Sequence, residues 1–179
     1  PMGTSAGVTG SDNIGIGYDA LEDLTSGVYN IGLGRAAGAN VTTGEANTLI
    51  GVFCGSGLTT GIRNTFMGYA AGSAVIDGSN NTIVGRNAGT DITSGSENTI
   101  LGASAAAAML TASQSIFIGL GANETGVTTG SRNIGIGRSA LRVVTSGANN
   151  TTLGDSAGIS ITTGSNNTVI GNGADASSA

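Results

Sequence analysis

The sequence predicts an all-β fold, a parallel β-solenoid of about ten coils with 17 residues each. Three observations lead to this prediction. The phrase Asn-Thr-Ile-Val-Gly at 81–85 recurs with small changes about every 17 residues. Glycine accounts for 33 of the 179 residues, whereas proline occurs once. Short β-branched runs bounded by Gly and Asn are typical of strands joined by tight turns, because Gly and Asn tolerate positive φ.

An asparagine opens each coil. Ser115 replaces it in the seventh coil, and one extra residue precedes the next asparagine. Stacked coils place equivalent residues about 4.8 Å apart, so we expect the asparagines to hydrogen-bond as a ladder. This column comprises Asn13, Asn30, Asn47, Asn64, Asn81, Asn98, Asn133, Asn150 and Asn167.

Three apolar columns repeat in register with asparagine and are predicted to fill the interior. The first lies just before a glycine and runs from Ile16 to Ile170, with Val84 and Leu101 among its members. The second is almost entirely Ala and includes Cys54. The third runs from Leu24 to Ile161 and includes Val127. A helical interpretation of the four-residue spacing is disfavoured, because glycine costs about 1 kcal/mol in a helix interior.

The chain is predicted to form one repeat domain at 13–174, with a partial coil at 1–12 and a tail at 175–179. An irregular coil is expected at about 103–129, where Gly and Asn positions are lost and the extra residue falls between 120 and 127. Leu21 and Leu141 stand where most coils have glycine and mark two local variants.

Composition argues against catalysis and against several kinds of binding. Without histidine and with one cysteine, the usual zinc and transition-metal ligand sets are absent. The carboxylates occupy different columns, so no pair for glycoside hydrolysis is evident. Glycine pairs such as Gly15 and Gly17 are repeat units rather than a dinucleotide-binding motif. Cys54 is expected to be a small buried thiol. We predict no enzyme activity, no cofactor and no metal.

Two partner classes are also predicted to be absent. The net charge is −5 and the six Arg are dispersed, which excludes a basic stripe for nucleic acid. Apolar runs such as Ala105 to Leu110 are far too short for a membrane span, so no membrane insertion is expected.

The segments Asn-Thr-Ile-Val-Gly-Arg-Asn-Ala-Gly at 81–89 and Ser-Asn-Asn-Thr-Val-Ile-Gly at 165–171 resemble repeats of two groups of surface fibres. One is the head of trimeric autotransporter adhesins, whose repeats are shorter. The other comprises phage tail fibres and proteins with an endosialidase-type chaperone domain. The resemblance covers 13–174 and implies a left-handed β-roll assembled as a homotrimer, adjoining fibre domains, and an extracellular location on a virion or bacterial surface.

The function predicted from these features is a structural, non-catalytic fibre segment that mediates attachment to a glycan or protein receptor on a cell surface. Two alternatives are a glycan-active tailspike segment and an ice-binding solenoid. The latter would use a threonine column that Ile76 and Leu110 interrupt: Thr25, Thr42, Thr59, Thr93, Thr128, Thr145 and Thr162.

Alternation along the strand predicts the oligomer interface. If Thr82 and Val84 point into the coil, Ile83 points outward. Its column would then expose an apolar stripe, and burying each large side chain against a partner is worth about 1.5 to 3 kcal/mol. The predicted interface residues are Leu49, Phe66, Ile83, Ile100, Phe117 and Val169.

Overall fold

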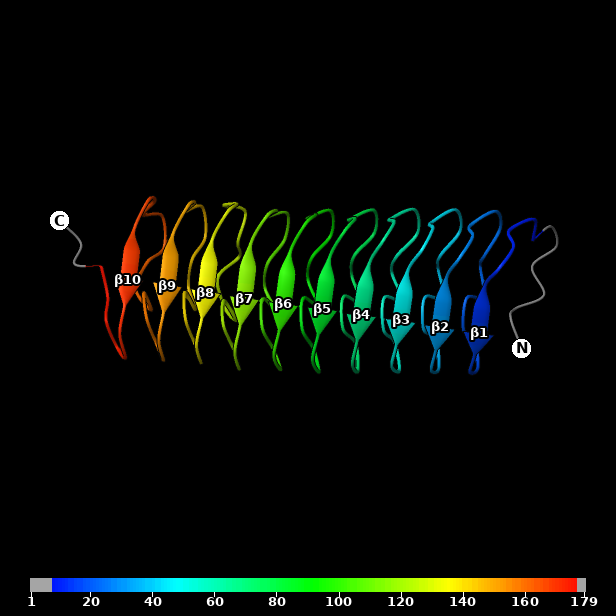
Figure 1. Ribbon diagram of the computed structural model, residues 1–179, viewed down its shortest axis with the longest axis horizontal. Coiled ribbons are helices and arrows are strands. Elements are labelled where there is room, and N and C mark those ends of the chain that lie inside the picture. The colour runs from blue at the N-terminus through cyan, green and yellow to red at the C-terminus, as the bar shows by residue number, and fades with distance from the viewer. Residues whose placement is uncertain (1–7, 177–179) are drawn as a thin grey trace.

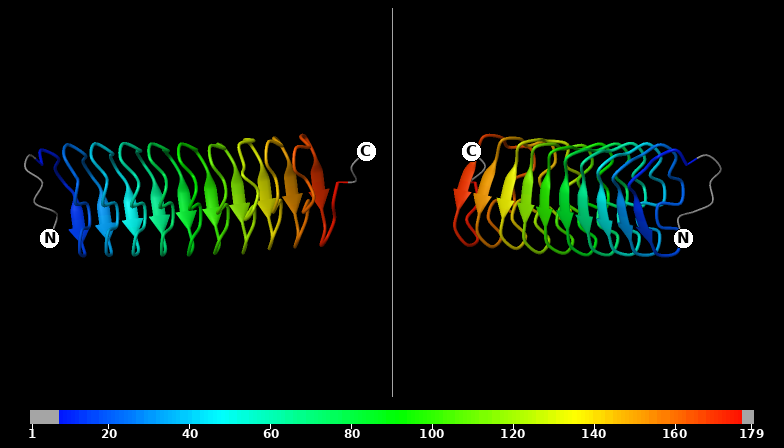
Figure 2. Two further views of the ribbon diagram at one scale, coloured as in Figure 1. Left: turned by 180° about the vertical axis from the view of Figure 1, so that it is seen from behind. Right: turned by 45° about the vertical axis from the view of Figure 1, so that its right-hand side comes forward.

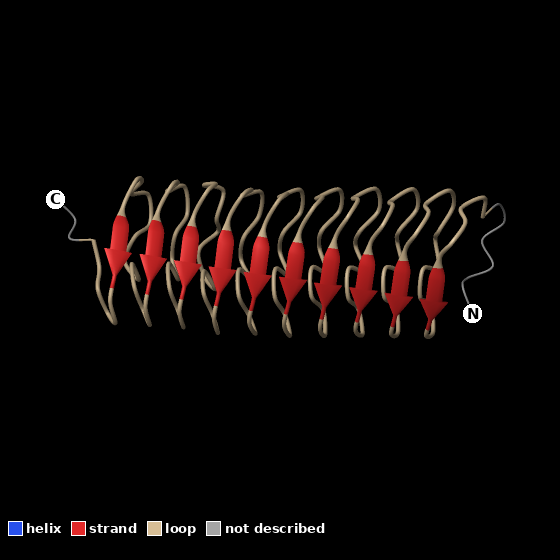
Figure 3. Cartoon of the chain, viewed as in Figure 1, coloured by secondary structure: helices blue, strands red, loops and turns tan. Residues whose placement is uncertain are grey.

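The computed structural model describes residues 8–176. Within them the chain forms ten three-residue strands and no helix (Figure 3). All ten belong to one parallel sheet in sequence order (Figure 1). The strands are β1 Ile14–Ile16, β2 Ile31–Leu33, β3 Thr48–Ile50, β4 Thr65–Met67, β5 Thr82–Val84, β6 Thr99–Leu101, β7 Ile116–Ile118, β8 Ile134–Ile136, β9 Thr151–Leu153 and β10 Thr168–Ile170.

The predicted parallel β-solenoid is therefore confirmed. The strands lie along one side of the rod, and turns complete each coil (Figure 2). We number each coil after its strand. Paired residues are 17 apart in sequence, as for Ile14 and Ile31, except between β7 and β8, where Ile116 pairs with Ile134. The predicted partial coil at 1–12 and tail at 175–179 lie partly outside the described residues. Within 8–12, the amides of Thr9 and Gly10 donate to the carbonyl of Thr25.

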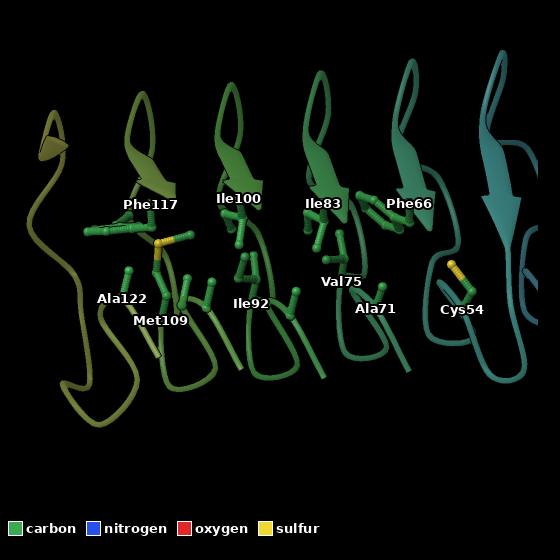
Figure 4. Close-up of a cluster of buried hydrophobic side chains, with 14 of the residues drawn as sticks. Cys54, Phe66, Ala71, Val75, Ile83, Ile92, Ile100, Met109, Phe117 and Ala122 are labelled. Carbon is green, nitrogen blue, oxygen red and sulfur yellow. The ribbon is translucent and has the colours of Figure 1, made fainter. Parts of the chain in front are cut away.

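Where the middle residue of a strand has a side chain, it points into the rod, and the side chains of the two outer residues point away from it. Phe66, Ile83, Ile100 and Phe117 are fully buried and project into the interior in Figure 4. Ile16, by contrast, is 59% exposed. The prediction that the column from Ile16 to Ile170 fills the core is wrong, and so is the outward placement of the middle residues.

The asparagine ladder explains this orientation. Asn81 is buried, and its amide nitrogen donates to Asn64 Oδ1 at 3.2 Å and to the Gly95 carbonyl at 2.9 Å. Because side chains alternate along an extended chain, an inward asparagine places the residue two positions later, Ile83, inward as well. Ser115 breaks the ladder, although its hydroxyl still accepts a hydrogen bond from the Asn133 amide at 3.2 Å.

Leu21 fills space that Gly32 leaves in the middle of β2, and Leu141 occupies the equivalent position of coil 8. Both are fully buried at positive φ, 53° and 50°. A Cβ at Gly32 would lie only 2.9 Å from Cγ of Leu21. Where the middle residue is large the arrangement reverses, and a Cβ at Gly72 would lie 2.7 Å from the Phe66 ring. The two positions therefore share one volume, and burying a leucine offsets the strain of about 1 to 2 kcal/mol at positive φ.

Coil 7 contains the extra residue, as predicted, and local inward and outward positions are exchanged there. Val127 is 55% exposed, whereas Thr128 is fully buried. The placement of Val127 in the core is therefore wrong. An insertion shifts the alternation of side chains by one, which turns Thr128 inward. Its hydroxyl lies 2.8 Å from Asn123 Oδ1 and 2.7 Å from the Val144 carbonyl oxygen. Asn123 Nδ2 is buried without a hydrogen-bond partner.

Candidate functional site

The outward face of the strands is a regular surface that runs the length of the ten-stranded sheet. It carries two rows of side chains. Rank one, the first residue of each strand, comprises Ile14, Ile31, Thr48, Thr65, Thr82, Thr99, Ile116, Ile134, Thr151 and Thr168. Rank two, the third residue, comprises Ile16, Leu33, Ile50, Met67, Val84, Leu101, Ile118, Ile136, Leu153 and Ile170. Neither rank contains a charged side chain, and every member is exposed or half-buried.

The predicted interface residues lie on the opposite side of the same strands. Five of them are fully buried and Val169 is 8% exposed, so all six pack inside their own coils: Leu49, Phe66, Ile83, Ile100, Phe117 and Val169. A partner chain cannot reach them without opening the coil, and their assignment as an oligomer surface is corrected here. The strands do carry an exposed apolar stripe, but it consists of rank two, which sequence reasoning placed in the core.

Two further rows border this face. Flank A, the residue before the opening position of each coil, comprises Asp12, Tyr29, Ala46, Arg63, Asn80, Glu97, Gln114, Arg132, Asn149 and Asn166. Flank B, two residues after each strand, comprises Tyr18, Arg35, Val52, Tyr69, Arg86, Ala103, Leu120, Arg138, Asp155 and Asn172. Together they contain all three tyrosines of the chain and five of its six arginines.

Polar and aromatic contacts run along the flanks from one coil to the next. In flank A, Gln114 Nε2 donates to Glu97 Oε2 at 3.1 Å, and Arg132 Nε donates to Gln114 Oε1 at 3.2 Å. In flank B, Arg138 pairs with Asp155 at 2.9 Å. The hydrogen bond that Arg138 donates to Asp155 lowers the pKa of this carboxyl group below its usual value.

An aromatic cluster lies beside flank B. The Arg35 guanidinium lies 5.2 Å from the centre of the Phe53 ring, which in turn meets Tyr69 edge-to-face at 6.2 Å. Tyr69 is exposed and Phe53 is half-buried. These three residues come from coils 2, 3 and 4, so the cluster follows the long axis of the rod.

The threonine column proposed for ice binding is used for internal hydrogen bonds. Thr25 Oγ1 donates to the Thr42 carbonyl at 3.0 Å, and Thr59 Oγ1 donates to the Ile76 carbonyl at 3.1 Å. The hydroxyl protons of these side chains therefore point along the rod to the next coil. Thr128 departs from the column and lies inside the coil.

Cys54 is buried in the alanine column, as predicted. Burial raises the pKa of its thiol to about 12, although backbone hydrogen bonds involving Ile50 and Gly68 partly oppose the shift. The thiolate is the reactive form of cysteine, so this side chain is inert at neutral pH. Across residues 8–176, no three Cys, Asp or Glu side chains come together in a way that could hold a metal ion.

No helix within the described part of the chain has the length and apolar character needed to cross a membrane. Comparison of the chain with protein-family models, curated proteins and solved structures yields no match. The likeness to surface-fibre repeats therefore depends on the residues of the repeat itself.

Proposed function

We propose that this chain is a structural, non-catalytic segment of an extracellular fibre, either a phage tail fibre or a bacterial surface adhesin. It assembles as a homotrimer of left-handed β-rolls, joins neighbouring fibre domains and helps attach the fibre to a receptor on a cell surface. The observation that carries the proposal is the unbroken register of ten parallel strands. With strands about 4.8 Å apart, nine spacings give a sheet about 43 Å long.

Hydrogen bonds parallel to the rod axis support a mechanical role. Besides the backbone bonds, three kinds of side chain connect successive coils. Asparagines form the buried ladder, threonines donate to carbonyls of the next coil, and serine hydroxyls accept from backbone amides, as Ser96 does from Ser79 at 3.0 Å. Stretching or bending the rod would have to break several such bonds at one level, which suits a stalk that transmits force.

Two observations make the alternative functions less suitable. In the threonine column predicted for ice binding, the hydroxyls would have to be free to meet ice, whereas those of Thr25 and Thr59 donate within the chain. A glycan-cleaving site would need two carboxyl groups close together with perturbed pKa values. The pKa of Asp155 is lowered, but the main cause is hydrogen bonding to its exposed partner Arg138 and not a second carboxyl group.

Mass measurement by sedimentation or light scattering tests the proposal most directly. The expected result is a trimer at micromolar concentration, with small-angle scattering from a rod. A folded monomer over the full concentration range would refute the fibre assembly. Release of oligosaccharides from bacterial surface polysaccharides would refute the non-catalytic role.

A further inference from the structure

Ranks one and two together form an uncharged strip that continues along the whole sheet. Met67 and Leu153 of rank two are 43% and 48% exposed, and the twenty positions contain only Ile, Leu, Val, Met and Thr. Sheets that face water usually present polar and charged residues on that side. Monomeric proteins rarely expose a continuous apolar patch of several hundred Å². The strip therefore has the composition of a covered surface.

The size and border of the strip fit a protein interface. Three residues per strand span about 10 Å, so the sheet alone covers about 430 Å². With the flanks, a width of about 20 Å gives about 860 Å², close to the roughly 800 Å² that each partner buries in a standard interface. Tyrosine and arginine are enriched in protein interfaces, and both are concentrated in flank A and flank B.

The repeat spacing identifies the partner. Side chains along each rank recur about every 4.8 Å, and a surface can match ten such levels only if it has the same spacing. We infer that ranks one and two are the surface on which a second copy of this chain packs, with the copies parallel and in register. This inference rests on the proposed self-associating fibre, and it assigns the interface to residues other than the six buried ones.

The order of residues in rank one favours the parallel arrangement. Isoleucine occupies coils 1, 2, 7 and 8, and threonine the other six. Within residues 8–176, the hydroxyls of these six threonines make no hydrogen bond to the rest of the chain, unlike that of Thr25. Parallel copies in register bring threonines to the same height, where their hydroxyls can bond one another.

An antiparallel arrangement with full overlap pairs coil 1 with coil 10 and coil 3 with coil 8. Every isoleucine level then meets a threonine level, and the threonine hydroxyls there lack a rank-one partner. A buried hydroxyl without a partner is costly. Sliding the copies by two coils restores the match but leaves β9 and β10 of each copy uncovered. Only the parallel register satisfies both conditions over the full length.

Two matched substitutions in coil 4 test the surface. Met67 lies in rank two, and Ile76 lies on a different face with similar exposure, 43% against 49%. Met67→Asp should weaken self-association about a hundredfold in sedimentation, because it places a charge in the apolar centre of the interface. Ile76→Asp should leave the mass unchanged. Leu153→Asp serves as a second variant, and circular dichroism checks that each protein is folded.

The outcomes separate the two proposals. If the unmodified protein is a trimer and both Met67→Asp and Leu153→Asp remain trimers, the surface assignment is wrong while the fibre proposal stands. If Met67→Asp dissociates the assembly but the protein cleaves polysaccharide, the fibre proposal fails and the surface stands. If the unmodified protein is a monomer, both the fibre proposal and the surface assignment are refuted, whether or not its solution shows thermal hysteresis.

Cross-linking tests the orientation. In a Cys54→Ala background, which removes the native thiol from an alanine column, Thr151→Cys provides one thiol on β9. A short bismaleimide should join copies in high yield if they are parallel, because equivalent residues lie at the same height. In the antiparallel overlap, coil 9 faces coil 2 and the thiols are about 34 Å apart. Absence of cross-linked product in an assembled protein would overturn the parallel register.

Discussion

The asparagine ladder offers a sharp test of what stabilises the rod. The Asn81 side chain takes part in four hydrogen bonds: it donates to Asn64 Oδ1 and the Gly95 carbonyl, and its Oδ1 accepts from the backbone and side-chain nitrogens of Asn98. Asn81→Ala removes all four. The Asn98 side chain keeps its bond to Ala112. The backbone amide of Asn98 and the carbonyl of Gly95, however, each lose the hydrogen bond that they made with the Asn81 side chain.

The expected cost follows from these two groups. A buried polar group without a partner costs about 1 to 3 kcal/mol, so the loss at these two groups should lower the free energy of unfolding of Asn81→Ala by about 2 to 6 kcal/mol. Asn81→Ser should cost about half as much, because a serine hydroxyl can accept from the next amide, as Ser115 does from Asn133. The exposed Asn40 provides the control, and Asn40→Ala should change stability by less than about 0.5 kcal/mol.

Urea denaturation of the three variants, followed by circular dichroism, measures these differences. Because a repeat protein can unfold in parts, hydrogen exchange of the amides near Asn98 should accompany it. The reasoning fails if Asn81→Ala costs less than about 1 kcal/mol, or if Asn81→Ser is as damaging as Asn81→Ala. Either result would mean that backbone pairing and apolar packing hold the coils together without help from the ladder.

Three further predictions follow from burial. Ile100→Asp should abolish folding, because it buries an unpaired charge. Leu101→Asp, on the outward face, should fold with a normal circular dichroism spectrum but associate poorly. The opposite pattern would refute the strand orientation. Cys54 keeps its proton in the folded state until about pH 12 but loses it near pH 9 when unfolded, so stability should fall as pH rises between these values. At pH 10 this contribution is about 1 to 2 kcal/mol, and urea titrations should show that Cys54→Ala removes it. Amides near Asn123 should exchange faster than those near Val84, because coil 7 has a buried unpartnered amide and an interrupted ladder, and equal protection would contradict this.

The repeat determined most of the architecture in advance. Spacing of 17 residues predicted the parallel register, and the single insertion predicted the shift between β7 and β8. Recurrent asparagine predicted a ladder, which the structure contains from Asn13 to Asn98 and again from Asn133 to Asn167. Cys54 was placed correctly because only small residues share its column. These features depend on period and size alone, which a single sequence displays directly.

The direction of the strand face was harder to predict. Alternation divides strand residues into two sets but does not say which set is inside. Rank two looks like a core because it is uniformly aliphatic, while the middle column includes Gly15, Phe66 and Thr152 and looks irregular. The useful signal was the asparagine. A polar side chain that recurs at the start of nearly every coil can hydrogen-bond to its equivalents in the neighbouring coils, and it does so inside the rod. Because side chains alternate, the residue two positions later then points inward as well.

The irregular interior and the regular exterior have different physical causes. Inside the coil, a glycine in the middle of a strand is compensated within the chain, as when Leu21 fills the space beside Gly32, so the middle column can vary in size from level to level. Rank two has no such compensating position, because its side chains point away from their own coil. If these ten positions faced only water, polar residues would be tolerated at any of them, yet all ten are Ile, Leu, Val or Met. The self-packing that we infer would supply this constraint, because another copy of the chain offers an apolar surface that repeats at the same spacing.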